Sequence, residues 1–158
     1  MKKFVIQFVF LILIIFGALI YSSGKFPGFN SLTEQGQSKL KINETEIILE
    51  IADSADERKI GLGGREMLAT DSGMLFVFEK QGKYGFWMKG VKFPLDMIWI
   101  REKKVVDIIK NALPPTPDQK EEDLPIYMPK ENVDMVLEVN GGFSDSQRIK
   151  IGDIVELR

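Results

Sequence analysis

A chain of 158 residues, 44% hydrophobic and 28% charged, has the composition of one globular domain with an additional segment. It contains no histidine and no cysteine, which excludes Ser-His-Asp triads, Cys-His dyads, disulfides and zinc sites built from those side chains. Its net charge of −2 gives no electrostatic reason to expect nucleic-acid binding.

The N-terminal end of the chain has the pattern of a membrane anchor. Lys2 and Lys3 precede residues 4–21, which are almost entirely apolar. About 18 apolar residues can span the hydrocarbon core as a helix, whereas the apolar part of a cleavable signal is usually ~7–15 residues. Length therefore favours a retained anchor within residues 1–24 over a cleaved signal. The preceding lysines favour the cytoplasmic side. This predicts a single-pass protein of the cytoplasmic membrane with its C-terminal domain outside, or a secreted domain if the segment is cleaved.

Residues 25–38 are rich in Gly, Ser, Gln and Asn, as expected for a flexible linker. The folded domain is predicted to occupy residues 39–158. Apolar and polar residues alternate over residues 39–51, with Asn43-Glu44-Thr45 in the middle. This pattern predicts a β-hairpin.

Ser54 marks the start of a short predicted helix. Glu57 follows three positions later, which is the spacing of a reciprocal capping box. The helix is expected to end near Ile60, because Gly61 follows and glycine commonly terminates helices.

Strand signals dominate the rest of the domain. Residues 111–130 are the exception, because their five prolines remove N–H donors from any ladder and predict a long surface loop. The acidic run in this loop lacks the spacing of a calcium-binding EF-hand. The domain is predicted to be mainly β, a compact antiparallel β-sandwich or barrel of about seven strands with one short helix. The predicted later strands are 73–78, 84–88, 95–100, 105–109, 133–139 and two short strands within 149–157.

Three motifs lie between residues 73 and 100. They read GMLF at 73–76, FWMK at 86–89 and PLD at 94–96. Their succession resembles the DUF192 (UPF0127) family of small bacterial and archaeal domains. The resemblance covers roughly residues 47–157 and implies a compact β-sandwich-like domain. It implies no activity, because the biochemical role of the family is unknown.

Arg58 matches the family's acidic-Arg-x-x-Gly-Leu signature. Its guanidinium offers a planar fork for a carboxylate or a phosphate. The structural alternative is an ion pair with a strand carboxylate such as Glu138, which would pin the helix to the sheet. We favour the structural role.

The FWMK motif supplies the next candidates. Successive residues of a strand point to opposite faces, so Phe86 and Met88 share one face while Trp87 and Lys89 share the other. If the first face is core, the indole and the ammonium line a groove for a peptide, a sugar ring or a lipid headgroup. The alternative is that Trp87 is a packing residue.

Two carboxylates interrupt apolar strands. Asp96 stands at the start of one, and Glu138 lies within another. Asp96 is either a ligand-binding or acid–base carboxylate, or an acceptor for turn N–H groups around Gly90. A buried carboxylate needs a partner, and Arg58 or Lys89 could provide one.

Three functions remain open, and the first is preferred. It is a non-enzymatic, membrane-tethered binding domain for an envelope component or a protein partner, without cofactor, metal or catalytic residue. The second is a hydrolase of envelope polysaccharide, with two acids about 5–5.5 Å or ~6.5–9.5 Å apart in one cleft. Asp96 and Glu138 are the only pair nominated. The third is a structural element without a site. The predicted ligand-binding residues are Arg58, Trp87, Met88, Lys89, Asp96 and Glu138.

Overall fold

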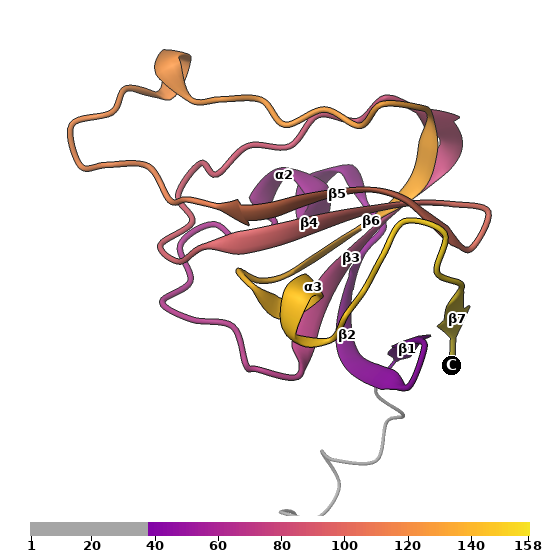
Figure 1. Ribbon diagram of the computed structural model, residues 1–158. Helices are drawn as coiled ribbons and strands as arrows, with labels where there is room; N and C mark the ends of the chain where they lie inside the picture. The colour runs from indigo at the N-terminus through magenta and orange to yellow at the C-terminus, as the bar shows by residue number, and fades with distance from the viewer. Residues whose placement is uncertain (1–37) are drawn as a thin grey trace, which may run out of the picture. The chain divides into compact units, whose positions relative to one another are not determined.

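The computed structural model describes residues 38–158 (Figure 1). The predicted anchor and nearly all of the predicted linker lie outside these residues. Within residues 38–158, no helix has the length and apolar character needed to cross a membrane. The elements are β1 (Lys39–Ile42), β2 (Thr45–Ala52), α2 (Ala55–Ile60), β3 (Ser72–Gly82), β4 (Leu95–Arg101), β5 (Lys104–Ala112), the 3-10 turn η1 (Glu121–Asp123), β6 (Val133–Asn140), α3 (Phe143–Ser146) and β7 (Val155–Leu157).

The strands form one curled sheet in the order β5-β4-β6-β3-β2-β1-β7. A bridge between Lys104 and Ile154 connects the segments at the two ends of that order. The mainly β prediction with seven strands is confirmed. Of the predicted sandwich or barrel, the sandwich form is wrong, because the strands make a single curled half-barrel; two short helices form where one was predicted. The predicted antiparallel pairing is also wrong for β2 and β3, which pair in parallel. A parallel pair needs a crossover, and α2 with the loop after it provides one.

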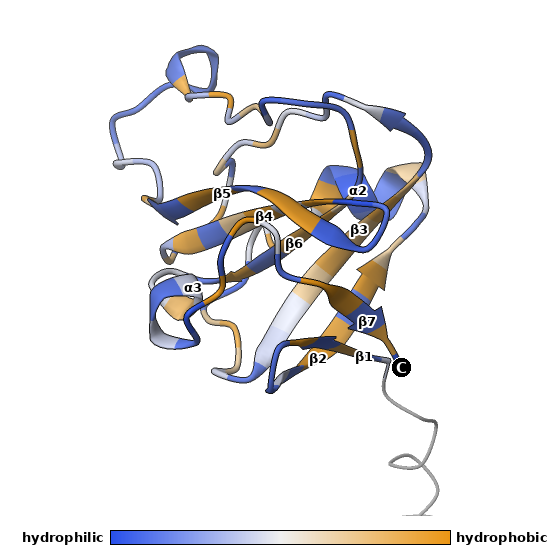
Figure 2. Ribbon diagram, turned by 45° about the vertical axis from the view of Figure 1, so that its right-hand side comes forward, coloured by the Kyte–Doolittle hydropathy of each residue, from blue (hydrophilic) through white to orange (hydrophobic). Residues whose placement is uncertain are grey.

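Both faces of the sheet are apolar, which is why the half-barrel needs covering segments on its outside. Side chains from all seven strands fill the inside of the curl, and Figure 2 shows the strands mainly in the hydrophobic colour. We call the buried set on the other face the outer cluster. Each fully buried large apolar side chain contributes about 1.5–3 kcal/mol. The outer cluster consists of Ala52, Leu62, Leu68, Met74, Phe76, Met88, Val91, Leu95, Met97, Trp99, Val106, Ala112, Val133 and Val136.

The local predictions at the start of the domain are confirmed. β1 and β2 form a hairpin, with Asn43 at the turn in the left-handed region at φ 54°. In α2, the Ser54 hydroxyl accepts from the Glu57 N–H, and the Glu57 carboxylate accepts from the Ser54 N–H at 3.0 Å. The helix ends at Gly61. No residue of α2 is buried, so the helix is held by its cap and by polar contacts rather than by an apolar face.

Two predictions about the later chain are wrong. Residues 84–88 form no strand, only a bridge between Phe86 and Tyr127. This pairing stops after one residue because Pro125 and Pro129 flank Tyr127 and cannot donate to a ladder. Only β7 forms in residues 149–157, where two short strands were predicted.

Candidate functional site

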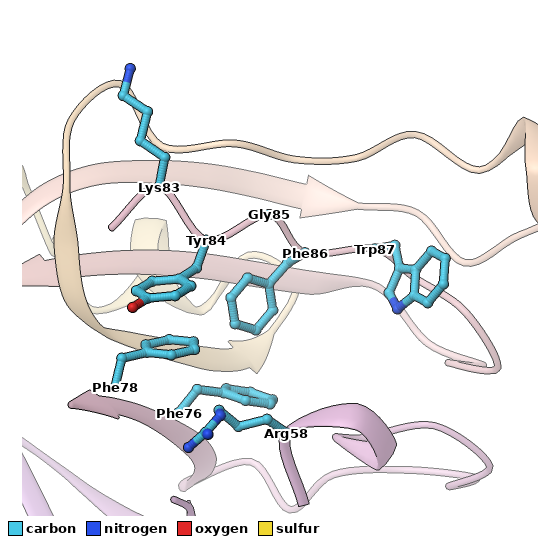
Figure 3. Close-up of a pocket in the computed structure, with 8 residues that line it drawn as sticks. All are labelled: Arg58, Phe76, Phe78, Lys83, Tyr84, Gly85, Phe86 and Trp87. Atoms are coloured by element: carbon cyan, nitrogen blue, oxygen red, sulfur yellow. The ribbon is translucent and has the colours of Figure 1, made fainter. Parts of the chain in front are cut away.

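A pocket of about 260 Å³ lies between α2 and the extended segment that follows β3 (Figure 3). The outer face of β3 contributes two aromatic rings to it, and the extended segment contributes three. Of the residues of α2, only Arg58 contributes to the lining of this pocket. The lining residues are Arg58, Phe76, Phe78, Lys83, Tyr84, Gly85, Phe86 and Trp87.

The aromatic rings of the pocket are locked against one another. Phe78 and Tyr84 stack with centroids 3.6 Å apart and planes 6° apart. Phe76 and Phe86 meet edge to face at 4.8 Å and 83°. The Tyr84 hydroxyl donates to the Lys80 carbonyl at 2.6 Å, which fixes the ring further. These contacts preorganise the pocket, so a ligand would not need to order the rings on binding.

Arg58 is fixed by carbonyl groups and not by a carboxylate. Its Nη1 donates to the Val77 carbonyl at 2.9 Å and to the Asp53 carbonyl. Its guanidinium carbon lies 5.3 Å from the centroid of the Phe78 ring. No carboxylate of residues 38–158 forms an ion pair with it. The predicted pairing with Glu138 is therefore wrong, although Arg58 does connect α2 to β3.

The predicted division of the FWMK motif between two faces holds only in part, because Phe86 lines the pocket together with Trp87. Met88 is buried in the outer cluster, while the Trp87 side chain is 43% exposed at the pocket. The Lys89 ammonium lies 5.2 Å from the centroid of the Trp87 ring and pairs with Glu121 at 2.5 Å. Met88 and Lys89 do not line the pocket.

Asp96 has the position of a structural carboxylate. It is fully buried and accepts three backbone N–H groups, from Asn111 at 2.8 Å, Gly142 at 3.0 Å and Ser144 at 2.8 Å. These bonds connect the end of β5 and the start of α3 to β4. The backbone N–H groups around Gly90, which were predicted to donate to Asp96, are not among these three donors. With its oxygens occupied by the backbone, Asp96 is not placed to contact a ligand.

Glu138 is buried on the opposite face of the sheet. It lies in register with Met74 on one side and Met97 on the other, and it is 4% exposed. No protein group of residues 38–158 donates to its carboxyl group, so neither Arg58 nor Lys89 is its partner. Desolvation by burial raises the pKa of Glu138 to about 8. The carboxyl group is therefore mostly protonated at neutral pH.

Asp96 and Glu138 do not form an acid pair. Asp96 lies in register with Val139, whose side chain faces the inside of the curl, whereas Glu138 faces the outer cluster. Adjacent positions on a strand point to opposite faces, so the sheet separates the two carboxyl groups. The predicted hydrolase lacks its cleft. Within residues 38–158, no group of three acidic side chains is arranged to hold a metal ion.

A second hollow of about 180 Å³ lies beside α2, on the side of β2. Its charged groups already have partners, because Arg65 forms a bidentate pair with Glu50, with Nη2 to Oε2 at 2.7 Å. The hydrogen bond from Arg65 lowers the pKa of Glu50. The aromatic pocket is the better candidate site, because its guanidinium has no anionic partner among the described residues.

The sequence-predicted site residues are only partly brought together. Arg58 and Trp87 line the aromatic pocket, whereas Met88, Lys89, Asp96 and Glu138 do not. The other rings of the pocket, among them Phe76, Phe78 and Tyr84, were not predicted as site residues. Alternation along β3 places both phenylalanines on one face, and this was the available signal for them.

Comparison with known proteins agrees with this fold. Residues 38–157 match the model of the DUF192 family, described as "Uncharacterized ACR". A crystal structure from Sinorhizobium meliloti 1021, provisionally described as a transcription regulator, is 30% identical, with a TM-score of 0.67 over 77% of this chain and 92% of that one. A protein of unknown function from Novosphingobium aromaticivorans DSM 12444 is 27% identical, with a TM-score of 0.68 over 82% of this chain and 91% of that one. No curated protein matches.

Proposed function

This chain belongs to the DUF192 family, and we propose that its domain is a non-catalytic binding domain held outside the cytoplasmic membrane by the N-terminal segment. The observation that carries the proposal is the aromatic pocket with Arg58 at its wall. A preformed concave site with many aromatic side chains and one fixed charged group is typical of ligand-binding sites. The pocket contains no pair of groups suited to acid–base or nucleophilic chemistry, so binding is favoured over catalysis.

The apolar run of residues 4–21, preceded by Lys2 and Lys3, is the observation that supports the tether. The chain enters the domain at β1, which Figure 1 shows at the end away from the loop at residues 113–130. The extended segment 83–87, which lines the pocket, contacts that loop through the bridge between Phe86 and Tyr127. Within residues 38–158, the extended segment that lines the pocket therefore lies toward this loop and not toward β1. The description of the S. meliloti relative as a transcription regulator is not carried over, because acidic residues outnumber basic ones here, 23 to 21.

The tether is tested by locating the full-length protein in cells. Membrane fractionation should recover it with the cytoplasmic membrane, and a protease added outside that membrane should digest the domain. A chain lacking residues 4–21 should lose the membrane association. Recovery of the intact chain in the cytosolic fraction would refute the tether.

Binding is tested with the full-length chain in detergent, immobilised and exposed to solubilised envelope material. The Trp87→Ala variant should lose most of the bound signal, because Trp87 is the most exposed ring of the pocket. The matched control is Ile151→Ala, which removes an exposed apolar side chain that does not line the pocket. Equal retention by Trp87→Ala and by the unmodified chain would refute this site.

A further inference from the structure

The charge of the aromatic pocket selects an anionic ligand. Its lining contains two cationic side chains and no acidic one, in a chain whose net charge is negative. Figure 3 shows Lys83 pointing away from the rings, which leaves Arg58 as the cation beside them. A guanidinium has five N–H donors, and the bonds to Val77 and Asp53 use Nη1 alone. The donors on Nε and Nη2 have no acceptor within residues 38–158.

The remaining donors of Arg58 suit a carboxylate. Nε and one N–H of Nη2 point in parallel from the guanidinium plane, and a carboxylate accepts such a pair in bidentate fashion. The two carbonyl bonds and the Phe78 ring keep this plane in a fixed orientation. The ligand's charged end is therefore expected at Arg58, with the rest of the ligand toward the rings.

The rings select a flat aromatic group. Phe78 and Tyr84 cover each other's faces, and Phe76 meets Phe86 edge to face. A further ring is favoured where its face meets exposed ring edges, because aromatic edges are positive and aromatic faces negative. Pockets for drug-sized ligands have volumes of about 300–1,000 Å³. At about 260 Å³ this pocket is suited to one ring and not to an extended oligomer.

We infer that the ligand of this pocket is a single aromatic ring carrying a carboxylate, bound with the carboxylate on Arg58 and the ring among Phe76, Phe78 and Tyr84. The inference rests on the proposed binding function and gives its ligand a chemical class. Two sources share this chemistry. One is a free aromatic acid, and the other is the C-terminal aromatic residue of a polypeptide.

The test is calorimetric titration of the full-length chain in detergent micelles, with empty micelles as the blank. The probes are N-acetylphenylalanine, its amide, phenylacetate, glucuronate and a pentapeptide ending in phenylalanine with a free carboxylate. N-acetylphenylalanine should bind at least about 10-fold more tightly than its amide, since one charged hydrogen-bonded contact is worth about that factor. Phenylacetate and the pentapeptide then distinguish the free acid from the polypeptide end.

Variants of Arg58 test whether this residue causes the preference for N-acetylphenylalanine over its amide. Arg58→Gln should abolish the difference between the acid and the amide, and Arg58→Lys should retain part of it, because lysine keeps the charge but not the fork. The matched control Lys59→Gln changes the same charge on the same helix outside the pocket lining and should bind as the unmodified chain does. If Arg58→Gln fails to fold, Trp87→Ala serves instead and should weaken binding of both acid and amide.

Four outcomes would overturn this ligand class. Equal binding of acid and amide would remove the role of the carboxylate, and tighter binding of glucuronate would replace the aromatic ring with a sugar acid. The third outcome is that no probe binds while the immobilised chain still needs Trp87 to retain envelope material. This would refute the ligand class and leave the proposed binding function in place. If neither probes nor envelope material depend on Trp87, both proposals fall together.

Discussion

Replacing Glu138 by glutamine should change the pH dependence of stability more than any other single substitution in the domain. The carboxyl group is buried between Met74 and Met97 without a hydrogen-bond donor among the described residues. Burial raises its pKa from 4.5 to about 8. The folded protein therefore retains a proton that the unfolded chain releases over most of the range between these two values.

The sign and size of the effect follow from proton linkage. Where the folded state binds more protons than the unfolded state, the free energy of unfolding falls as pH rises. The stability contributed by the protonated Glu138 should be complete below about pH 4.5, fall as pH rises toward 8 and be lost above it. One pH unit is worth about 1.36 kcal/mol, so the penalty at high pH approaches about 5 kcal/mol. Between pH 5 and pH 8 the expected loss is about 3–4 kcal/mol, a large part of a typical total of about 5–15 kcal/mol.

The assay is urea unfolding of the full-length chain from pH 5 to pH 9, followed by far-UV circular dichroism. The chain contains no histidine or cysteine, so few other groups titrate in this range. Glu138→Gln should give a nearly flat profile and be more stable than the unmodified chain at pH 8 by about 3 kcal/mol. Glu79→Gln, an exposed change on β3, should keep the original slope. Parallel profiles for Glu138→Gln and the unmodified chain would refute the assignment.

Three further predictions concern stability and the two tryptophans. Asp96→Asn should lower the free energy of unfolding by about 3 kcal/mol, because a charged acceptor of three backbone N–H groups becomes neutral; a loss below ~1 kcal/mol in urea unfolding would argue against this role. Ser54→Ala should cost about 1 kcal/mol and raise amide hydrogen exchange in α2 first, as expected for a lost helix cap; unchanged exchange there would contradict it. Trp99→Ala should destabilise by about 3–5 kcal/mol because the side chain is fully buried, whereas Trp87→Ala should change stability far less. Equal thermal shifts for these two variants would be inconsistent with the structure.

The hairpin and the helix cap could be predicted from sequence because they depend on neighbouring residues. The alternation on either side of Asn43 specifies two strands and a tight turn. Ser54, Glu57 and Gly61 specify where α2 begins and ends through contacts three or four residues apart. Local chemistry decides these elements, and the surrounding fold does not alter them.

The hydrogen-bond partners of Arg58 and Asp96 could not be predicted in the same way. Arg58 was expected to pair with Glu138, but it bonds to the carbonyls of Val77 in the middle of β3 and of Asp53 before α2. Asp96 was expected to bond near Gly90, but its partners come from residues that are 15, 46 and 48 positions away in the chain. Which groups meet depends on strand order and register, and neither is written in a local pattern.

By itself, the sequence determined a mainly β domain with a capped short helix, a buried Met88 next to an exposed Trp87, and an apolar N-terminal segment. Only the tertiary structure decided that β2 and β3 run in parallel, that the two buried acids lie on opposite faces, and that Arg58 and Trp87 border one pocket. The physical reason is how far apart along the chain the interacting residues are. Caps, turns and face alternation arise from contacts within a few residues, whereas a pocket and the pKa of a buried carboxyl group arise from segments brought together by the closing of the whole sheet.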